Sequence, residues 1–379
     1  MSGAPDPARA KAPDYADMSG IELFRHVCTA TGIPSSGVAE YRLSDGNVAR
    51  LSFDQDLQSG LRKYMEKSRV PYAVFVAVEP KTGRVLANVS YSSLMPSWEP
   101  LASFYAYPMA SLFKIVTAAA AFESGKVTAE TLLPFRGGPC SESPNRWGKT
   151  GKSRDAGMLL CDAMARSVNP AFGRLAADRL GKPLLVATAQ HFGFGAYPFG
   201  GDFIASGKIP STSTDGELMR MAAGLDQKVR ISPFHVAMLF AAIGNGGVMP
   251  APSFVDAVND PAGRNLYTLA AAPLTAIISP AVAGELIRSM SGTVSSGTAR
   301  KAFSGPAGQR FRTGIVVAGK TGSINGDNPR GHYGWFAGVA PAADPKIAFV
   351  ALVVNGNMLK LKAPQLGREA LDIFFRGAR

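Results

Sequence analysis

Cysteine is scarce in this sequence: Cys28, Cys140 and Cys161 are the three among 379 residues. Three thiols are too few for a disulfide scaffold, and no C-x-x-C pair of the kind that binds zinc occurs. Cys140 and Cys161 enclose a short loop, and whether they form a bridge, worth about 3 kcal/mol, stays open at this stage. We predict no metal site and no cofactor, and a fold that depends on its hydrophobic core.

A long apolar run is also absent. No stretch of about 18 apolar residues occurs, as a membrane-spanning helix would need. The N-terminal segment MSGAPDPARAKAPDYAD is polar and lacks the charged start and apolar middle of a secretion signal. The residues by themselves leave two alternatives: a cytoplasmic chain, or one whose export segment or anchor lies outside this sequence.

Basic residues are numerous but not clustered. The net charge of +12 favours anionic partners, such as nucleic acid, anionic lipid or an acidic wall polymer. However, Lys and Arg are scattered along the chain, and the sequence has no basic run, nucleic-acid-binding motif or zinc-finger spacing. We interpret the charge as a solvated basic surface and predict no nucleic-acid partner.

The chain is predicted to divide into residues 1–50, a flexible tail with a short stub, and residues 51–379, one large domain. Within the first part, residues 1 to about 18 are expected to be disordered, and the rest is too short for a core of its own. Residues 124–157 are rich in Gly, Pro and Ser and are predicted to be loop.

Strands and helices are expected in a definite order in the large domain. After a helix that begins near Asp54, YAVFVAVEPKTGRVLANVS predicts a β-hairpin, and several helices follow. Three strand-like runs, TGIVVAGKTGS, GWFAGVAP and IAFVALVVNG, then precede a final amphipathic helix at 363–375. This order predicts an α+β fold: a five-stranded antiparallel sheet flanked by helices, with an inserted all-α subdomain.

One apolar segment, PMASLFKIVTAAAAFESG, carries Ser111 and Lys114 three positions apart. Side chains at i and i+3 share one helix face, so the two can touch. Because the predicted helix is apolar nearly all round, we expect it to be buried, and burial disfavours a charged lysine. A neutral amine beside a hydroxyl is a general base beside a nucleophile. An S-x-x-K spacing also arises by accident, so the other motifs must decide.

The motif K-T-G occurs three times, beginning at Lys81, Lys149 and Lys320. Turn chemistry explains the first, in the hairpin, and the second, in a Gly/Pro-rich loop. Lys320, Thr321 and Gly322 instead continue a β-branched strand, GIVVAGKTGS. A strand edge can pair with a peptide-like substrate while Lys320 and Thr321 hold its carboxylate.

The motif S-x-N also occurs three times, beginning at Ser143, Ser167 and Ser323. Ser143 lies in the predicted loop, and Ser323 overlaps the end of the K-T-G strand. Ser167 and Asn169 fall at the junction of two predicted helices, where short polar side chains can project into a cleft. The alternative for this third pair is an ordinary helix cap before Pro170.

Three motifs in this order, with GHYGWFAGVAP after the third, resemble the transpeptidase domain of penicillin-binding proteins over about residues 50–379. The blocks NPAFGRLA and SPFHVAMLFAAIGNGG are similar to that family as well. The resemblance implies a β-lactamase-like fold with the site between the sheet and the helical subdomain. It also implies a location at the cell envelope, on the periplasmic or extracytoplasmic face.

The resemblance implies a role for each motif residue. Ser111 would be acylated by the D-Ala-D-Ala end of a peptidoglycan stem peptide or by a β-lactam, with Lys114 as the base. The acyl group would then pass to an amine of a neighbouring strand. Implied partners also include a glycan-polymerising membrane protein. The catalytic set would be Ser111, Lys114, Ser167 and Asn169, and the substrate-binding set Lys320, Thr321, Gly322 and Ser323.

Other functions stay open on these residues. A D-Ala-D-Ala carboxypeptidase would use water as the acceptor, and a serine β-lactamase would hydrolyse its acyl-enzyme. No E-x-x-x-N setting for the added glutamate of one β-lactamase class lies between Asn169 and Lys320. A non-enzymatic sensor or scaffold would keep the fold and bind antibiotic.

A Ser-His-Asp hydrolase is the last alternative. The sequence has no G-x-S-x-G elbow, and its histidines are four: His26, His191, His235 and His332. His235 falls in an apolar helix and is interpreted as a core residue, whereas His332 follows the third motif and is a candidate for lining the site.

Overall fold

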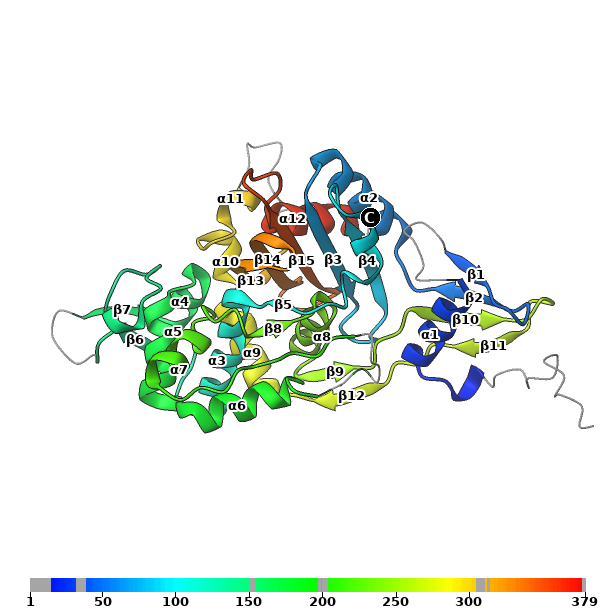
Figure 1. The fold of residues 1–379 in the computed structure, drawn as a ribbon. Coiled ribbons are helices and arrows are strands. Elements are labelled where there is room, and N and C mark those ends of the chain that lie inside the picture. Colours follow the sequence, from blue (N-terminus) through cyan, green and yellow to red (C-terminus); the bar gives the residue numbers. More distant parts are fainter. Residues whose placement is uncertain are drawn as a thin grey trace, which may run out of the picture.

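A five-stranded antiparallel sheet organises the fold of this computed structural model, which describes residues 15–31, 39–149, 155–196, 199, 204–304, 311 and 314–376. Its strands lie in the order β13-β14-β15-β3-β4, so the sheet joins both ends of the large domain, as predicted (Figure 1). The strands are β3 (Tyr72–Val78), β4 (Val85–Tyr91), β13 (Ala318–Asp327), β14 (Arg330–Ala340) and β15 (Ile347–Asn355). Within the described residues, β13 is an edge strand.

Helices cover both faces of this sheet. The strands β3 and β15 are buried along their whole length, which explains why their sequences are continuously apolar instead of alternating. Val74 and Val76 of β3 belong to one core with α8, whereas Ala73 and Phe75 belong to a second core with α2 and α12. These helices are α2 (Gln55–Ser68), α8 (Pro233–Gly244) and α12 (Ala363–Phe374).

Local capping sets where two of these helices begin. The side chain of Asp54 accepts a hydrogen bond from the backbone N–H of Leu57 at the start of α2. Ser232 caps α8 in the same way, and Pro233 occupies the first helical position, where a missing N–H costs nothing. The predicted start of α2 near Asp54 is therefore confirmed.

A group of helices forms the inserted subdomain beside the sheet, at the left of Figure 1. Its central helix, α3, is apolar and contacts α5, α6, α7 and α9. The helices are α3 (Lys114–Glu123), α4 (Leu160–Arg166), α5 (Asn169–Leu175), the π-helical η6 (Ala176–Leu180), α6 (Gly181–His191), α7 (Asp215–Ala222), α9 (Pro280–Met290), α10 (Gly292–Ser295) and α11 (Arg300–Phe303). The predicted α+β class with a helical insertion is confirmed, although the insertion also contains a short pair of strands.

Residues 124–157 are not all loop, and this prediction was too simple. Two four-residue strands pair there, and a short 3₁₀ turn lies between them; residues 150–154 fall outside the described chain. Strands so short show no clear period among Gly and Pro residues. The small elements of the subdomain and its surroundings are β5 (Tyr107–Pro108) with β8 (Arg230–Ile231), β6 (Leu132–Phe135) with β7 (Ala156–Leu159), β9 (Val248–Pro250) with β12 (Pro273–Ala276), η3 (Pro96–Leu101) and η5 (Pro144–Arg146).

A second, four-stranded sheet forms from two distant parts of the chain, in the order β1-β2-β10-β11. Its elements and the helices beside it are η2 (Tyr15–Asp17), α1 (Gly20–Thr31), β1 (Glu40–Arg42), β2 (Val48–Leu51), β10 (Val255–Asn259) and β11 (Asn265–Thr268). Tyr15 is buried and hydrogen-bonds to Asp45. The prediction that disorder extends to about residue 18 was therefore wrong for Tyr15. Residues 1–14 lie outside the described chain, and the division at residue 50 stays a prediction.

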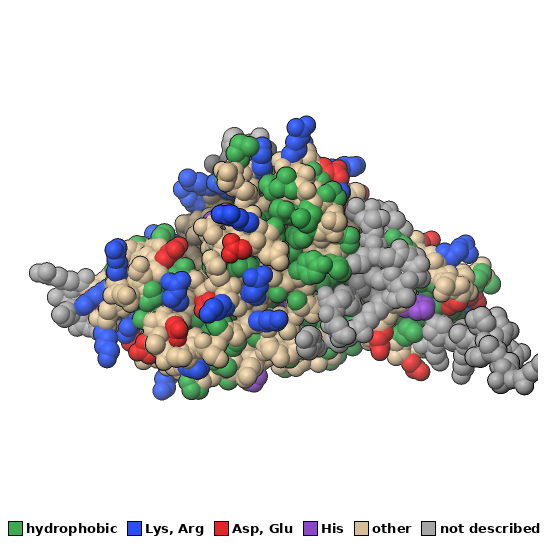
Figure 2. Space-filling model, viewed as in Figure 1, with side chains coloured by type: hydrophobic (Ala, Val, Ile, Leu, Met, Phe, Trp, Pro, Cys, Tyr) green, Lys and Arg blue, Asp and Glu red, His purple; other side chains and the backbone are tan. Residues whose placement is uncertain are grey.

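The structure describes the distribution of basic side chains and the state of two cysteines. Lys and Arg side chains are spread over several elements on the face shown in Figure 2, and they do not form a single patch there. Cys140 and Cys161 are free thiols, which answers the question of their pairing in this structure. In the described ranges, no helix combines the length and the apolarity that crossing a membrane requires.

Candidate active site

Ser111 lies in a 3₁₀ turn, not in an α-helix. The predicted helix over 108–125 is interrupted: η4 (Ala110–Phe113) is a 3₁₀ helix and leads directly into α3, which begins at Lys114. Because a 3₁₀ helix has three residues per turn, side chains at i and i+3 eclipse. The serine and the lysine are therefore placed one above the other more closely than in an α-helix.

The amine of Lys114 is completely buried and has three polar neighbours. Its Nζ lies 2.8 Å from Ser111 Oγ, 2.8 Å from Asn169 Oδ1 and 2.5 Å from the carbonyl oxygen of Ala223. Burial, and secondarily the charge of Lys320, lowers the pKa of Lys114 well below its ordinary value. Since amide and carbonyl oxygens only accept, a neutral amine directs its two N–H groups at Asn169 and Ala223. Its lone pair is then left for the hydroxyl of Ser111.

The backbone just before Ser111 is strained. Ala110 has a φ of 53°, a left-handed conformation that non-glycine residues rarely adopt. The turn packs against Gly224, whose φ is +70°, and a Cβ on that glycine would overlap the carbonyl group of Ala110. A glycine at position 224 thus allows the two backbones to meet and holds Ser111 over Lys114.

We expect Gly224→Ala to slow acylation of Ser111 at least tenfold and to lower stability. The added Cβ would displace η4, and misplacement of a nucleophile by about 1 Å can cost 10²-fold in rate; alanine at this φ costs about 1–2 kcal/mol as well. The measurement is the rate of labelling by a fluorescent penicillin, together with thermal unfolding. Gly125→Ala is the matched control, because its φ is +68° with nothing within 4 Å of a Cβ. It should lose stability but keep its labelling rate, and equal rates for the two variants would contradict the expectation.

Ser167 and Asn169 lie where α4 ends and α5 begins, as predicted from the sequence. Ser167 terminates α4 in the left-handed conformation, with φ 58°, and this conformation turns the chain toward the cavity. The backbone N–H of Asn169 donates to the carbonyl of Pro139, which fixes the start of α5. The interpretation of this pair as a mere helix cap is wrong, because Asn169 reaches Lys114 and no side-chain cap is present at α5.

The edge strand β13 closes the site on its other side. Lys320 is fully buried, and its Nζ lies 2.9 Å from Ser167 Oγ and 2.7 Å from the carbonyl oxygen of Thr321. Burial lowers the pKa of Lys320 to about 7. A Cβ on Gly322 would lie 3.3 Å from the backbone nitrogen of Ser111, so a larger residue would push the strand away from the nucleophile.

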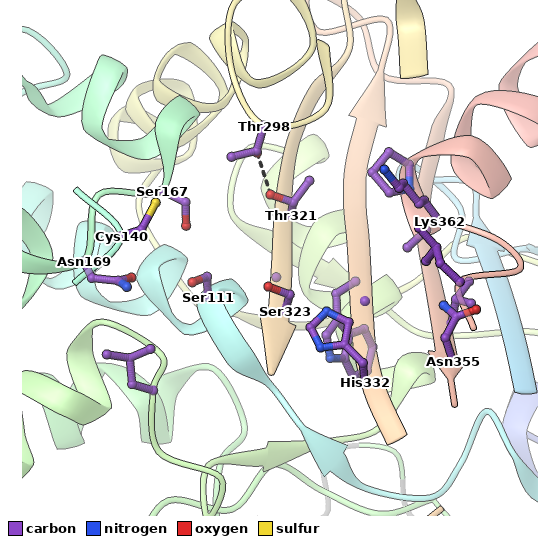
Figure 3. A pocket seen from close by; sticks show the side chains of 18 of the residues that line it. Ser111, Cys140, Ser167, Asn169, Thr298, Thr321, Ser323, His332, Asn355 and Lys362 are labelled. Carbon is purple, nitrogen blue, oxygen red and sulfur yellow. Dashed lines mark hydrogen bonds between the residues drawn. The ribbon is translucent and has the colours of Figure 1, made fainter. Parts of the chain in front are cut away.

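A cavity of about 520 Å³ joins these groups, and all of the predicted site residues except the buried Lys114 and Lys320 line it. Figure 3 shows Ser111, Ser167, Asn169, Thr321 and Ser323 around one opening between the helical subdomain and the sheet. The structure thus brings together the eight residues that were predicted from the sequence to form the site.

The decoy motifs lie elsewhere. Lys81 is exposed in the turn between β3 and β4, 3.3 Å from the carboxylate of Asp344. Lys149 is exposed in the loop after η5, and the rest of its K-T-G lies outside the described residues. Ser143 is an exposed residue that precedes η5. Sequence context separated these copies correctly from the ones at the cavity.

The interpretation of His235 as a core residue is confirmed, and His332, which the sequence offered only as a candidate for the site, lies at the cavity. His235 is fully buried: its Nδ1 accepts from the N–H of Gly207 at 3.1 Å, and its Nε2 lies 2.8 Å from the carbonyl oxygen of Phe192. Burial lowers its pKa to about 4. His332 lines the cavity, and its Nδ1 lies 3.0 Å from Asn325 Oδ1.

Sequence reasoning missed three contributors. Thr298 places its Oγ1 2.5 Å from Thr321 Oγ1, beside the K-T-G strand (Figure 3). The backbone carbonyl of Ala223 accepts from Lys114, and Cys140 lines the cavity near Asn169. No local pattern marks a lone threonine or a backbone oxygen, so only the folded chain reveals them.

Comparison with known proteins places the chain in a family. The model of the penicillin binding protein transpeptidase domain matches residues 73–371. Peptidoglycan D,D-transpeptidase PbpA of Mycobacterium tuberculosis is 28% identical over 323 residues, covering 74% of this chain and 61% of the relative. Stage V sporulation protein D of Bacillus subtilis is 25% identical and covers 85% and 54%, respectively. The chain therefore spans about half to three-fifths of the length of these two relatives.

Solved structures agree on the fold. Penicillin-binding protein A of M. tuberculosis, as its imipenem acyl-enzyme complex, superposes with a TM-score of 0.72 at 24% identity, covering 87% of this chain and 80% of that one. The D,D-transpeptidase domain of a peptidoglycan glycosyltransferase from Eggerthella lenta gives a TM-score of 0.69 at 24% identity, covering 89% and 85%. With its sheet, its helical insertion and most of its length matched, this chain belongs to the penicillin-binding protein transpeptidase domain family.

Proposed function

We propose that the protein is a peptidoglycan D,D-transpeptidase that works through an acyl-enzyme on Ser111. The observation that carries this proposal is the buried Lys114, whose amine lies 2.8 Å from Ser111 Oγ and faces acceptors on its other two sides. This arrangement suits a neutral base beside a nucleophile at neutral pH. PbpA of M. tuberculosis carries the same activity in its name, and it forms an acyl-enzyme with imipenem.

In the first half-reaction, Ser111 Oγ attacks the carbonyl carbon of the penultimate D-Ala of a stem peptide, and Lys114 takes the hydroxyl proton. The tetrahedral oxyanion is received by the backbone N–H groups of Ser111 and Ser323, a contribution of about 3–4 kcal/mol per donor. The C–N bond then breaks. The departing D-Ala nitrogen takes the proton that Lys114 had accepted, passed on through Ser167, which lies within hydrogen-bond reach of Lys320, and Lys114 is neutral again.

In the second half-reaction, an amine of a neighbouring stem peptide attacks the ester carbonyl. Lys114 takes the proton of the attacking amine and passes it to Ser111 Oγ as the ester C–O bond breaks, so Ser111 leaves as a hydroxyl and the new amide bond joins two strands. Asn169 holds the base in position and is within reach of the substrate amide, because its side chain lines the cavity. The same serine would be acylated by a β-lactam.

The terminal carboxylate of the donor would be held at β13. Lys320 supplies a cation, Thr321 a hydroxyl, and Thr298 a second hydroxyl 2.5 Å from the first. A carboxylate bound there favours the protonated form of Lys320, whose pKa burial has lowered to about 7. Gly322 lets the strand approach Ser111 closely enough for the donor to lie between them.

We also propose where the protein acts and with what. We place the protein at the cell envelope, on the extracytoplasmic face, where its substrate is found. Its partners would be the stem peptides, β-lactams and a glycan-polymerising membrane protein. The two-part division of the chain at residue 50 belongs to the same proposal.

One experiment tests the function against its rivals. The protein is incubated with a D-Ala-D-Ala stem peptide, with and without an added D-amino acid, and separately with benzylpenicillin, and products are followed by mass spectrometry. We expect D-Ala release, exchange of the terminal residue for the added D-amino acid, and a penicillin adduct on Ser111 that persists for many minutes. Hydrolysis without exchange would indicate a carboxypeptidase, rapid loss of the adduct a β-lactamase, and an adduct without D-Ala release a sensor.

A further inference from the structure

A second hollow continues the active-site cavity past the end of β13. It has a volume of about 720 Å³ and shares His332 with the first cavity. It is lined by the last residues of β13, the first residues of β14, the two residues after β15 and Gln227, which lies between α7 and β8. Its lining residues are all polar or glycine: Gln227, Asn325–Asp327, Arg330–His332, Gly356 and Asn357. A ligand there must therefore be held by charge and hydrogen bonds, because the described residues of the lining offer no apolar side chain.

Opposite charges meet at the tip of the β13–β14 hairpin. Asp327 and Arg330 are direct cross-strand partners, so their side chains lie on the same face of the sheet. Both are exposed, and among the described residues the structure records no ion pair for either. The hollow thus presents a carboxylate and a guanidinium side by side. A group that carries both an ammonium and a carboxylate matches this pair.

The edge strand β13 runs from the neighbourhood of Ser111 to Asp327, the first member of this charged pair. Residues two apart share one face of a strand, so Thr321, Ser323, Asn325 and Asp327 follow one another toward the hollow. A donor peptide that adds to the edge of β13 in the antiparallel sense has its terminal carboxylate at Thr321 and its earlier residues toward Asp327. Asp327 lies about 13 Å beyond Ser323, since a strand rises about 3.3 Å per residue. A long side chain on the residue before D-Ala-D-Ala would project into this region.

We propose that Asp327 and Arg330 form a specificity site for the side chain of the donor residue that precedes D-Ala-D-Ala, and that this site selects a diamino dicarboxylic acid. Asp327 binds the ammonium at the end of that side chain, and Arg330 binds its carboxylate. This inference rests on the proposed function, because it requires the donor to be acylated at Ser111.

The test compares three synthetic donors that differ only at the residue before D-Ala-D-Ala: a diamino dicarboxylic acid, lysine or alanine. The readout is the ratio of kcat/KM values for D-Ala release, which cancels any general loss of activity in a variant. We expect the wild-type protein to prefer the first donor over lysine, and lysine over alanine, by about tenfold at each step. Asp327→Asn should abolish the preference for lysine over alanine, and Arg330→Gln the preference for the diamino dicarboxylic acid over lysine.

Asp344→Asn is the matched control, since this exposed carboxylate lies in the turn between β14 and β15, next to Lys81 and Lys346. It should keep the wild-type ratios, and thermal unfolding checks that all three variants are folded. Equal kcat/KM values for the three donors on the wild-type protein, or unchanged ratios in both hairpin variants, would overturn the inference while penicillin still labels Ser111. Absence of D-Ala release from every donor would overturn the proposed function and the inference with it.

Discussion

Ser111→Ala protein is expected to form no covalent adduct with benzylpenicillin and to release no D-Ala. The acyl group needs the Oγ that lies 2.8 Å from the amine of Lys114, and no other hydroxyl is known to contact that amine in the described part of the chain. The lost step is the formation of the ester itself, so the effect is complete and not a fractional decrease. Intact-mass measurement after incubation with penicillin, followed by peptide mapping, checks the result.

A second serine variant tests whether the loss of any hydroxyl from the cavity is enough to prevent the adduct. Ser323→Ala removes a hydroxyl from the same cavity and leaves Ser111 in place, so its adduct should still form and should map to the peptide that contains Ser111. An adduct on the Ser111→Ala protein, on any residue of the cavity, would show that the nucleophile has been assigned wrongly.

Lys114→Met is expected to slow acylation by about 10²–10⁴, the usual contribution of a general base. Methionine has nearly the length of lysine and suits a completely buried position, but it cannot take the proton of Ser111. The second-order rate of labelling by a fluorescent penicillin gives the measurement. Lys81→Met is the control from a decoy motif, because that lysine is exposed and its recorded ion pair, with Asp344, lies on the surface. A Lys114→Met protein that labels at the wild-type rate would show that another group is the base.

The pH dependence of acylation provides an independent check on both lysines. The lone pair of Lys114 is available only above its pKa, which burial lowers, so kcat/KM should rise with pH in a limb well below the ordinary value of 10.5. The free protein should lose activity above about pH 7, as Lys320 loses the proton that attracts the carboxylate. The rising limb should disappear in Lys114→Met. Its persistence there would assign the limb to a different group.

Much of the fold follows from local patterns. The strand-like runs of β3, β13, β14 and β15 predicted a sheet built from both ends of the domain, and the apolar spacing after Asp54 predicted the helix α2. The small sheet β1-β2-β10-β11 was not predicted, because its two halves are separated by about two hundred residues and each is short. Pairing at that range depends on tertiary contacts and not on local propensity.

The candidate site shows the same limit. The spacing of three residues was enough to predict that the side chains of Ser111 and Lys114 can touch, because three residues make one turn of a 3₁₀ helix and nearly one turn of an α-helix. Spacing could not indicate that Asn169 and the carbonyl of Ala223 would occupy the other two directions around the amine. It also could not identify Thr298, which approaches Thr321 only because α10 packs against β13.

The sequence by itself determined which side chains could perform acyl transfer, through three ordered motifs on segments of recognisable type. Only the tertiary structure decided which groups surround the buried amine, namely Asn169 and the carbonyl of Ala223 beside Ser111, and that Thr298 lies beside Thr321. The physical reason is that a helix or strand is specified by neighbours within a few residues. The ionisation of an amine, in contrast, depends on every dipole and charge within a few ångströms, and most of these come from distant parts of the chain.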